Sequence, residues 1–135
     1  MAKLFSKTKI FRFLSGSRIG RQLIRKGFLL IAGHLPYKKI KQTENLLVFE
    51  HPQPSYPLHI ILMPTREIPT LQDVLPADTP FFQELLTTAA DIIKQKHLDQ
   101  FGYRLICNGG PYQQFPMLHF HLISEHYTPD DSQEG

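Results

Sequence analysis

The chain has 135 residues, a formal net charge of +3, 41% hydrophobic residues and 20% charged residues. This length suits one domain with one core, and the composition excludes general disorder, a fibrous repeat and a disulfide scaffold. Cys107 is the single cysteine, so it cannot form a disulfide within the chain, which favours a reducing compartment. The longest strongly apolar stretch, residues 27–33, is far shorter than the ~20 residues that cross a bilayer.

The charges are unevenly distributed along the chain. Residues 1–41 contain 11 of the 15 Lys and Arg residues, and the first acidic residue is Glu44. From Glu44 onward there are 4 basic and 12 acidic residues, which gives a basic arm of +11 and a body of −8. We therefore divide the chain into a basic amphipathic N-terminal extension (1–43), a body (44–127) and a polar tail (128–135).

The extension contains a helical pattern before Pro36. Basic side chains recur at Arg18, Arg21 and Arg25, with apolar residues on another face, which predicts a helix over residues 18–34. Three interpretations stay open: a packing helix with a solvated basic face, attachment of residues 3–41 to an anionic membrane or another phosphate-rich partner, and an organelle transit peptide. Near charged lipid each basic residue contributes ~1 kcal/mol. We expect a cytoplasmic protein, either free or peripheral to a membrane, with organelle targeting as the remaining alternative.

The body reads as strands around one helix. Strands are predicted at residues 46–49 and 58–63, with a proline-rich turn between them. A helix follows, capped by Asp78 or Thr79, and its apolar face comprises Phe82, Leu85, Leu86, Ala89, Ile92 and Ile93. Two more strands are predicted at residues 103–107 and 116–124. Because the other connections are too short for parallel crossovers, we expect an α+β fold with an antiparallel sheet and one long helix.

The last predicted strand carries two histidines on one face. Side chains alternate along a strand, so His119 and His121 point the same way as Met117, while the opposite face is apolar. The apolar face fixes the strand against a core and holds the imidazoles in a defined geometry. Three uses remain open: nucleophilic attack on phosphorus, a metal site completed by a ligand such as His59, and exposed histidines without a chemical role.

This stretch resembles the motif of the histidine triad (HIT) family of nucleotide-binding hydrolases and transferases. That motif is His-x-His-x-His followed by two apolar residues. Aligning residues 122–123 with the apolar pair puts His121 at the third histidine and His119 at the middle one, with Met117 at the position of the first. The resemblance covers roughly residues 46–124.

Two upstream segments extend the resemblance. Residues 49–64 look like the family's Phe, proline-rich turn, Pro-x-His and apolar run, and His59 matches an additional histidine beside the catalytic strand. Residues 103–110 match the strand and Asn-x-Gly turn that precede the motif. The three segments occur in the family's order.

The resemblance implies a nucleotide hydrolase or phosphoramidase. In this scheme His119 attacks the α-phosphorus of a nucleotide derivative, and water hydrolyses the resulting nucleotidyl-histidine. His121 would donate to phosphate oxygens, and His59 would support the site or orient His119. The implied substrate contacts are Asn108, Gln113, Gln114, Phe49 and His51. The scheme requires no metal or cofactor, predicts no specific nucleic-acid recognition, and implies a homodimer, because family members commonly pair by joining sheets.

The chain departs from the family pattern at two residues and in one connection. Met117 removes a polar partner from the catalytic face, and His51 replaces an acidic residue that commonly contacts ribose in the family. The connection from Asn108 to the motif is two residues shorter. The alternative function is a catalytically weakened nucleotide-binding or membrane-surface regulatory protein.

Overall fold

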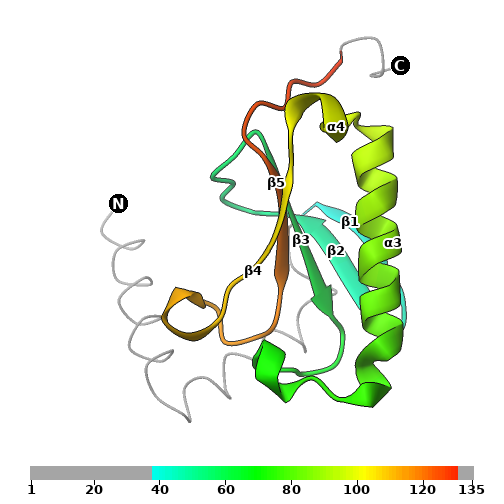
Figure 1. Ribbon diagram of the computed structural model, residues 1–135, viewed down its shortest axis with the longest axis vertical. Coiled ribbons are helices and arrows are strands. Elements are labelled where there is room, and N and C mark those ends of the chain that lie inside the picture. Colours follow the sequence, from blue (N-terminus) through cyan, green and yellow to red (C-terminus); the bar gives the residue numbers. More distant parts are fainter. Residues whose placement is uncertain (1–37, 131–135) are drawn as a thin grey trace. The chain divides into compact units, whose positions relative to one another are not determined.

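Residues 38–130 of the computed structural model form a five-stranded sheet and one long helix (Figure 1). All neighbouring strands are antiparallel, in the order β1-β2-β3-β5-β4. The strands are β1 (Lys39–Gln42), β2 (Leu46–Glu50), β3 (Leu58–Pro64), β4 (Arg104–Cys107) and β5 (Phe120–Ser124). The expected α+β class is therefore confirmed. The helix predicted at residues 18–34 lies outside the described residues.

The chain divides into two compact units. The described part of the sheet unit comprises residues 38–66, 75–107 and 119–130, and that of the loop unit comprises residues 67–74 and 108–118. The sheet unit contains every described strand, together with α3 (Thr79–Gln95), α4 (Leu98–Phe101) and the short 3-10 helix η2 (Pro76–Asp78). The loop unit contains two further 3-10 helices, η1 (Leu71–Asp73) and η3 (Gly110–Tyr112).

The centre of the sheet is buried on both faces. Every residue of β3 is buried, and β3 pairs with β2 on one side and β5 on the other. A strand buried on both faces is encoded by a continuous apolar run rather than by alternation, and this explains the sequence of residues 60–63. Strands β2 and β3 confirm the two predicted at residues 46–49 and 58–63, each one residue longer.

Strand β1 was not predicted. All four of its residues are exposed and two are lysines, so it lacks the apolar alternation that marks a half-buried strand. Its register against β2 shifts between Lys39 and Lys41. Charged residues and irregular register are typical of strands at the edge of a sheet.

Helix α3 begins as predicted, with Asp78 at the N-cap and proline in the first turn. It buries Phe81, Leu85, Thr88, Ala89 and Ile92, which recur at helical spacing on one face. The predicted face was partly wrong: Leu86 is 59% exposed, and Phe82 and Ile93 are half-buried. Adjacent residues lie about 100° apart around a helix, so burial of Leu85 turns Leu86 toward solvent.

Aromatic contacts identify the face of the sheet that α3 covers. The ring of Phe120 on β5 lies 6.4 Å from that of Phe81 and 6.1 Å from that of Phe82. Lys41 Nζ also donates to Thr88 Oγ1 at 3.2 Å, and this bond ties β1 to the same helix. Helix α3 therefore packs on the sheet face that carries Phe120, along the length of the strands (Figure 1).

An ion pair fixes the entry to α3. Arg66, which follows β3, donates from Nε and Nη2 to the two carboxylate oxygens of Asp78, at 2.8 and 2.6 Å. The Arg66 guanidinium, together with the Leu75 N–H, lowers the pKa of Asp78 below its usual value. The carboxylate therefore stays ionised, and the chain is anchored on both sides of the residues between β3 and α3.

Strand β5 is shorter than predicted, since it begins at Phe120 rather than at residue 116. In the loop unit, Pro116, Met117 and Leu118 are buried, and the Leu118 N–H donates to the Ile68 carbonyl at 2.8 Å. That donor is therefore used outside the sheet ladder. Within residues 38–130, no helix combines the length and apolarity needed to cross a membrane.

Candidate active site

The strand register places two of the predicted catalytic histidines on one sheet face. His121 on β5 pairs with Ile61 on β3, and His59 pairs with Ile123. Residues two apart in a strand share a face, so His59 and His121 are diagonal neighbours. Phe120, next to His121, points to the α3 side. The two histidines therefore lie on the face opposite α3.

Four imidazoles gather at this position: His51, His59, His119 and His121. His59 Nε2 and His121 Nδ1 are 2.8 Å apart, within hydrogen-bond distance. The His119 and His121 rings have centroids 4.8 Å apart at 65°, and the His51 and His59 rings stack at 4.3 Å and 25°. His119 immediately precedes β5, and His51 immediately follows β2. We call these four residues the histidine cluster.

The turn between β2 and β3 holds the cluster together. The His51 N–H donates to the His59 carbonyl at 2.8 Å. Within the turn, the Gln53 N–H donates to His51 Nδ1 at 3.0 Å and the Ser55 N–H donates to His59 Nδ1 at 3.1 Å. Both ring positions are therefore fixed by backbone donors.

Three rings of the histidine cluster have a lowered pKa and are therefore electrically neutral at pH 7. Burial, with smaller contributions from neighbouring imidazoles, lowers the pKa of His59 and that of His121 to about 4. Burial and the nearby His119 also lower the pKa of His51. These rings are neutral at pH 7, so each can donate through one nitrogen and accept through the other.

Phe49 lies in the same row of the sheet as His121. It pairs with Ile61, which in turn pairs with His121, so its side chain lies on the histidine face. Phe49 is 7% exposed. The structure thus brings together five of the residues that the resemblance singled out, namely the histidine cluster and Phe49.

The other implied substrate contacts belong to the loop unit. Gln113 Nε2 donates to the Pro69 and Phe115 carbonyls at 2.7 and 3.1 Å, so its amide nitrogen is engaged within that unit. Asn108 is half-buried and Gln114 is exposed. Met117, at the position of the family's first histidine, is completely buried.

The metal interpretation lacks a suitable arrangement of ligands in the part of the chain that the structure describes. Among residues 38–130, no group of three or more His, Cys, Asp or Glu residues is placed to hold a metal ion. The facing nitrogens of His59 and His121 approach each other at 2.8 Å instead of converging on a common point. Cys107 is half-buried, and burial raises its pKa, so it is a poor thiolate nucleophile.

A small cavity of about 130 Å³ adjoins the cluster and includes residues that sequence reasoning missed. His51 and His59 line it together with Lys96, at the end of α3, and Tyr127, after β5. Lys96 Nζ lies 5.7 Å from the centroid of the Tyr127 ring. Neither residue belongs to a motif, and no pattern in the sequence brings the two together.

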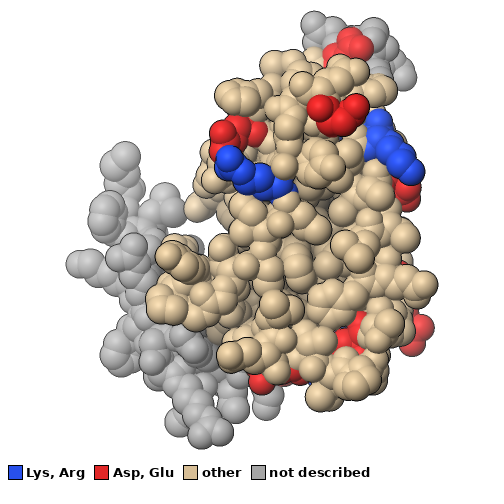
Figure 2. Space-filling view, viewed as in Figure 1, with Lys and Arg blue, Asp and Glu red and all other residues tan. Residues whose placement is uncertain are grey.

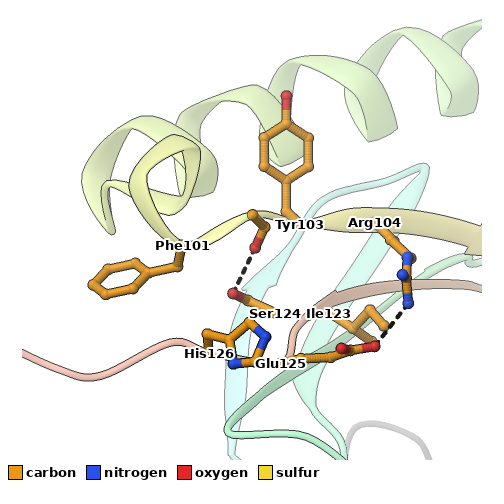
Figure 3. Close-up of a pocket in the computed structure, with 8 residues that line it drawn as sticks. Phe101, Tyr103, Arg104, Ile123, Ser124, Glu125 and His126 are labelled. Atoms are coloured by element: carbon orange, nitrogen blue, oxygen red, sulfur yellow. Dashed lines mark hydrogen bonds and ion pairs between the residues drawn. The ribbon is translucent and has the colours of Figure 1, made fainter.

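A larger cavity of about 240 Å³ lies away from the cluster, where β4 and β5 meet α4 (Figure 3). Three of its polar side chains are paired within the protein: Arg104 donates to Glu125 at 2.7 Å, and Ser124 Oγ donates to the Gly102 carbonyl at 2.6 Å. None of the predicted site residues lines it. The chemistry is therefore better placed at the histidine cluster.

Comparison with known proteins agrees with this geometry. Residues 29–134 match the family described as "Scavenger mRNA decapping enzyme C-term binding". The purine nucleoside phosphoramidase of Escherichia coli (strain K12) is 32% identical over 98 residues, which cover 70% of this chain and 81% of that protein. The chain belongs to the HIT family. A HIT-like protein of Buchnera aphidicola is 30% identical over 96 residues, which cover 70% of this chain and 84% of the relative.

Solved HIT structures share the fold. A HIT family hydrolase from Legionella pneumophila superposes with a TM-score of 0.65 at 29% identity, covering 72% of this chain and 89% of the other. A histidine triad protein from Clostridium difficile gives a TM-score of 0.64 at 26% identity, covering 75% and 90%. The family resemblance and the HIT fold expected from the sequence are therefore confirmed.

Proposed function

We propose that this HIT family protein is a nucleotide-binding hydrolase that acts on nucleoside phosphoramidates or phosphoanhydrides through a nucleotidyl intermediate on His119. The observation that carries the proposal is the histidine cluster. The ring centroids of His119 and His121 are 4.8 Å apart, and His121 is within hydrogen-bond distance of His59. The relative named as a purine nucleoside phosphoramidase supports a phosphoramidate substrate.

The proposed reaction has two balanced steps. A ring nitrogen of His119 attacks the α-phosphorus, a bond from that nitrogen to phosphorus forms, and the bond to the amine or phosphate leaving group breaks. The leaving group departs with a proton taken from solvent, and the water that attacks in the second step returns a proton to solvent. Water then attacks the same phosphorus, the histidine–phosphorus bond breaks, and the nucleoside monophosphate is released with His119 restored.

Charge develops on the phosphate oxygens during both steps, and His121 is suited to stabilise it. Its Nδ1 faces His59, which leaves Nε2 for a phosphate oxygen. Because the 2.8 Å bond joins His59 to His121, we assign His59 to positioning His121 rather than His119. The proposed substrate contacts are Phe49 and His51 in the sheet unit, with Asn108, Gln113 and Gln114 in the loop unit by resemblance.

The test is release of AMP from adenosine 5′-phosphoramidate by the full chain. We expect turnover by the native protein and a loss of about 10³-fold or more in His119→Ala. His126→Ala is the matched control, because His126 is an exposed histidine outside the cluster. Equal rates for the native protein and His119→Ala would remove the proposed mechanism.

The second candidate is a nucleotide-binding regulatory protein with weakened turnover. The observation that favours it is Met117, a buried apolar residue at the position of the first triad histidine. Calorimetric binding of AMP without hydrolysis of the phosphoramidate would support this candidate over the enzyme.

We also propose a homodimer joined through the β4 side of the sheet. Tyr103 and Leu105 are 48% and 37% exposed there. On the face seen in Figure 2, the charged side chains of the described residues gather toward the two ends and leave the middle uncharged. Sedimentation equilibrium should give twice the monomer mass of 15.6 kDa, and a monomer at micromolar concentration would contradict this proposal.

For the basic extension we propose binding to an anionic membrane surface through residues 3–41. Residues 1–43 contain 11 basic residues and no acidic residue, which supports this binding. The full chain should co-sediment with anionic vesicles at low salt and be released at high salt, because salt screens the attraction. Absence of binding at low salt would refute it.

A further inference from the structure

The turn between β2 and β3 supplies two backbone donors to the histidine cluster. It has the sequence His-Pro-Gln-Pro-Ser-Tyr-Pro at residues 51–57, which we call the proline-rich turn. Gln53 and Ser55 donate their N–H groups to Nδ1 of His51 and of His59. Proline has no N–H and a fixed φ, so the three prolines restrict both the number of donors in this turn and the freedom of its backbone.

These bonds determine where the hydrogens of two imidazoles lie. A backbone N–H can only donate, so the nitrogen that faces it must be unprotonated. Nδ1 of His51 and Nδ1 of His59 are therefore acceptors. In each neutral ring the hydrogen is then on Nε2, since a neutral imidazole carries one hydrogen.

The constraint passes from His59 to His121. Because Nε2 of His59 carries the hydrogen, the 2.8 Å bond must run from His59 Nε2–H to His121 Nδ1. Nδ1 of His121 is then an acceptor, and its own hydrogen lies on Nε2. The opposite tautomer of His121 would point a second hydrogen at the His59 donor and would break the bond.

We propose that the proline-rich turn fixes the tautomers of His51, His59 and His121, so that His51 and His121 present neutral Nε2–H donors to an anionic substrate. Ser55 is the positioning residue, through its backbone N–H, for His59 and, by relay, for His121. The use of the His121 donor on a phosphate oxygen rests on the proposed function, whereas the tautomers themselves do not.

Neutral donors have a chemical advantage beside a histidine nucleophile. Both His51 and His121 lie close enough to His119 to interact with it electrostatically, so a charged ring at either position would favour the neutral form of His119 but would also attract and retain the anionic product. Fixed N–H dipoles can stabilise charge that develops in the transition state without reorienting. The turn thus supplies preorganisation rather than charge.

The direct test is long-range ¹⁵N–¹H correlation spectroscopy of the full chain, labelled with ¹⁵N-histidine, at pH 7. The proposal expects the Nε2–H tautomer at His51, His59 and His121. Single-residue His→Asn variants assign the signals. A His51, His59 or His121 ring protonated at Nδ1, or at both nitrogens, would overturn the proposal whether or not the protein hydrolyses a nucleotide.

A matched pair of variants tests the role of Ser55. Ser55→Ala removes the hydroxyl and keeps the backbone N–H, so the tautomers should stay as in the native protein. Ser55→Pro removes the N–H, so His59 Nδ1 loses its donor, and His121 should shift toward the Nδ1–H tautomer with its Nε2 as an acceptor. We expect kcat/KM of Ser55→Pro to fall at least about tenfold below that of Ser55→Ala, since the loss of a transition-state donor costs up to about 10²–10³.

The outcomes separate this inference from the proposed function. Unchanged tautomers in a folded Ser55→Pro protein would overturn the role of the turn, and an amide spectrum that keeps the sheet signals establishes folding. Should Ser55→Pro fail to fold, the native and Ser55→Ala spectra still decide whether the three rings have the expected tautomers. Native tautomers as expected, together with no hydrolysis of any phosphoramidate, would contradict the proposed function and leave the inference supported.

Discussion

The two faces of the sheet carry neighbouring residues with different tasks. On the face toward α3, Phe120 and Leu122 pack in the core, and Leu122 is completely buried. On the opposite face, His121 lies between these two residues in sequence and bonds to His59. The alternation of β5 therefore packs one set of side chains against α3 and places His121 on the face where we propose the chemistry. The position of the imidazoles thus depends on apolar side chains on the opposite face of the sheet.

The largest effect is expected from a substitution on the sheet face that packs against α3. Leu122→Ala removes a fully buried side chain and leaves a cavity, which should lower the free energy of unfolding by about 2–5 kcal/mol. Urea denaturation of the full chain measures it. Leu86→Ala, at a 59% exposed position, is the matched control and should cost less than about 0.5 kcal/mol. A similar cost for both variants would contradict the placement of Leu122 in the core.

The complementary change is on the histidine face. His121→Ala removes the proposed phosphate donor and should lower kcat by about 10²–10³ with adenosine 5′-phosphoramidate. The same steady-state assay on His126→Ala should give the native rate. A native kcat in His121→Ala would show that the donor is not used.

Acid should destabilise the protein through the histidine face. The pKa of His59 and that of His121 fall from 6.5 to about 4 on folding, so the unfolded chain binds more protons than the folded chain between these values. The contribution of these two groups to the free energy of unfolding should therefore be constant above pH 6.5 and should decrease as the pH falls from 6.5 to 4. Thermal unfolding at a series of pH values measures it, and the decrease should be smaller in His59→Asn. An equal decrease in the native protein and His59→Asn would argue against the lowered pKa of His59.

The smallest expected effect is at the edge of the sheet. Lys41→Met keeps the aliphatic stem but removes the bond from Nζ to the buried Thr88 hydroxyl, which should cost ~1 kcal/mol of unfolding free energy. Lys39→Met on the same strand is the control, because Lys39 bonds to the exposed Gln42. Equal stability of the two variants would mean that β1 is not tied to α3 by this contact.

The sequence alone predicts the elements whose signals come from neighbouring residues. The apolar runs of β2 and β3 and the Asp78 cap of α3 can be read directly, because burial and capping act on neighbouring residues. Strand β1 could not be predicted, since all of its residues are exposed and two of the four are charged. The start of β5 depends on a bond from the Leu118 N–H to the Ile68 carbonyl, which links residues far apart in sequence.

The site was predictable to a similar extent. Alternation and the family resemblance together single out His59, His119 and His121. The bond between His59 and His121 depends on strand register, which no residue pattern determines. The backbone donors of the turn, and the nearness of Lys96 to the cluster, likewise arise only from the folded chain.

The central claim is that His119 is the nucleophile, and trapping its covalent intermediate tests this most directly. The full chain is quenched in the presence of a slowly hydrolysed adenosine phosphoramidate analogue, and its peptides are examined by mass spectrometry. The account predicts an adenylyl group on the peptide that contains His119, located on that residue by fragmentation, and no such adduct in His119→Ala. Release of AMP by the native protein with an adduct on another residue would contradict the account.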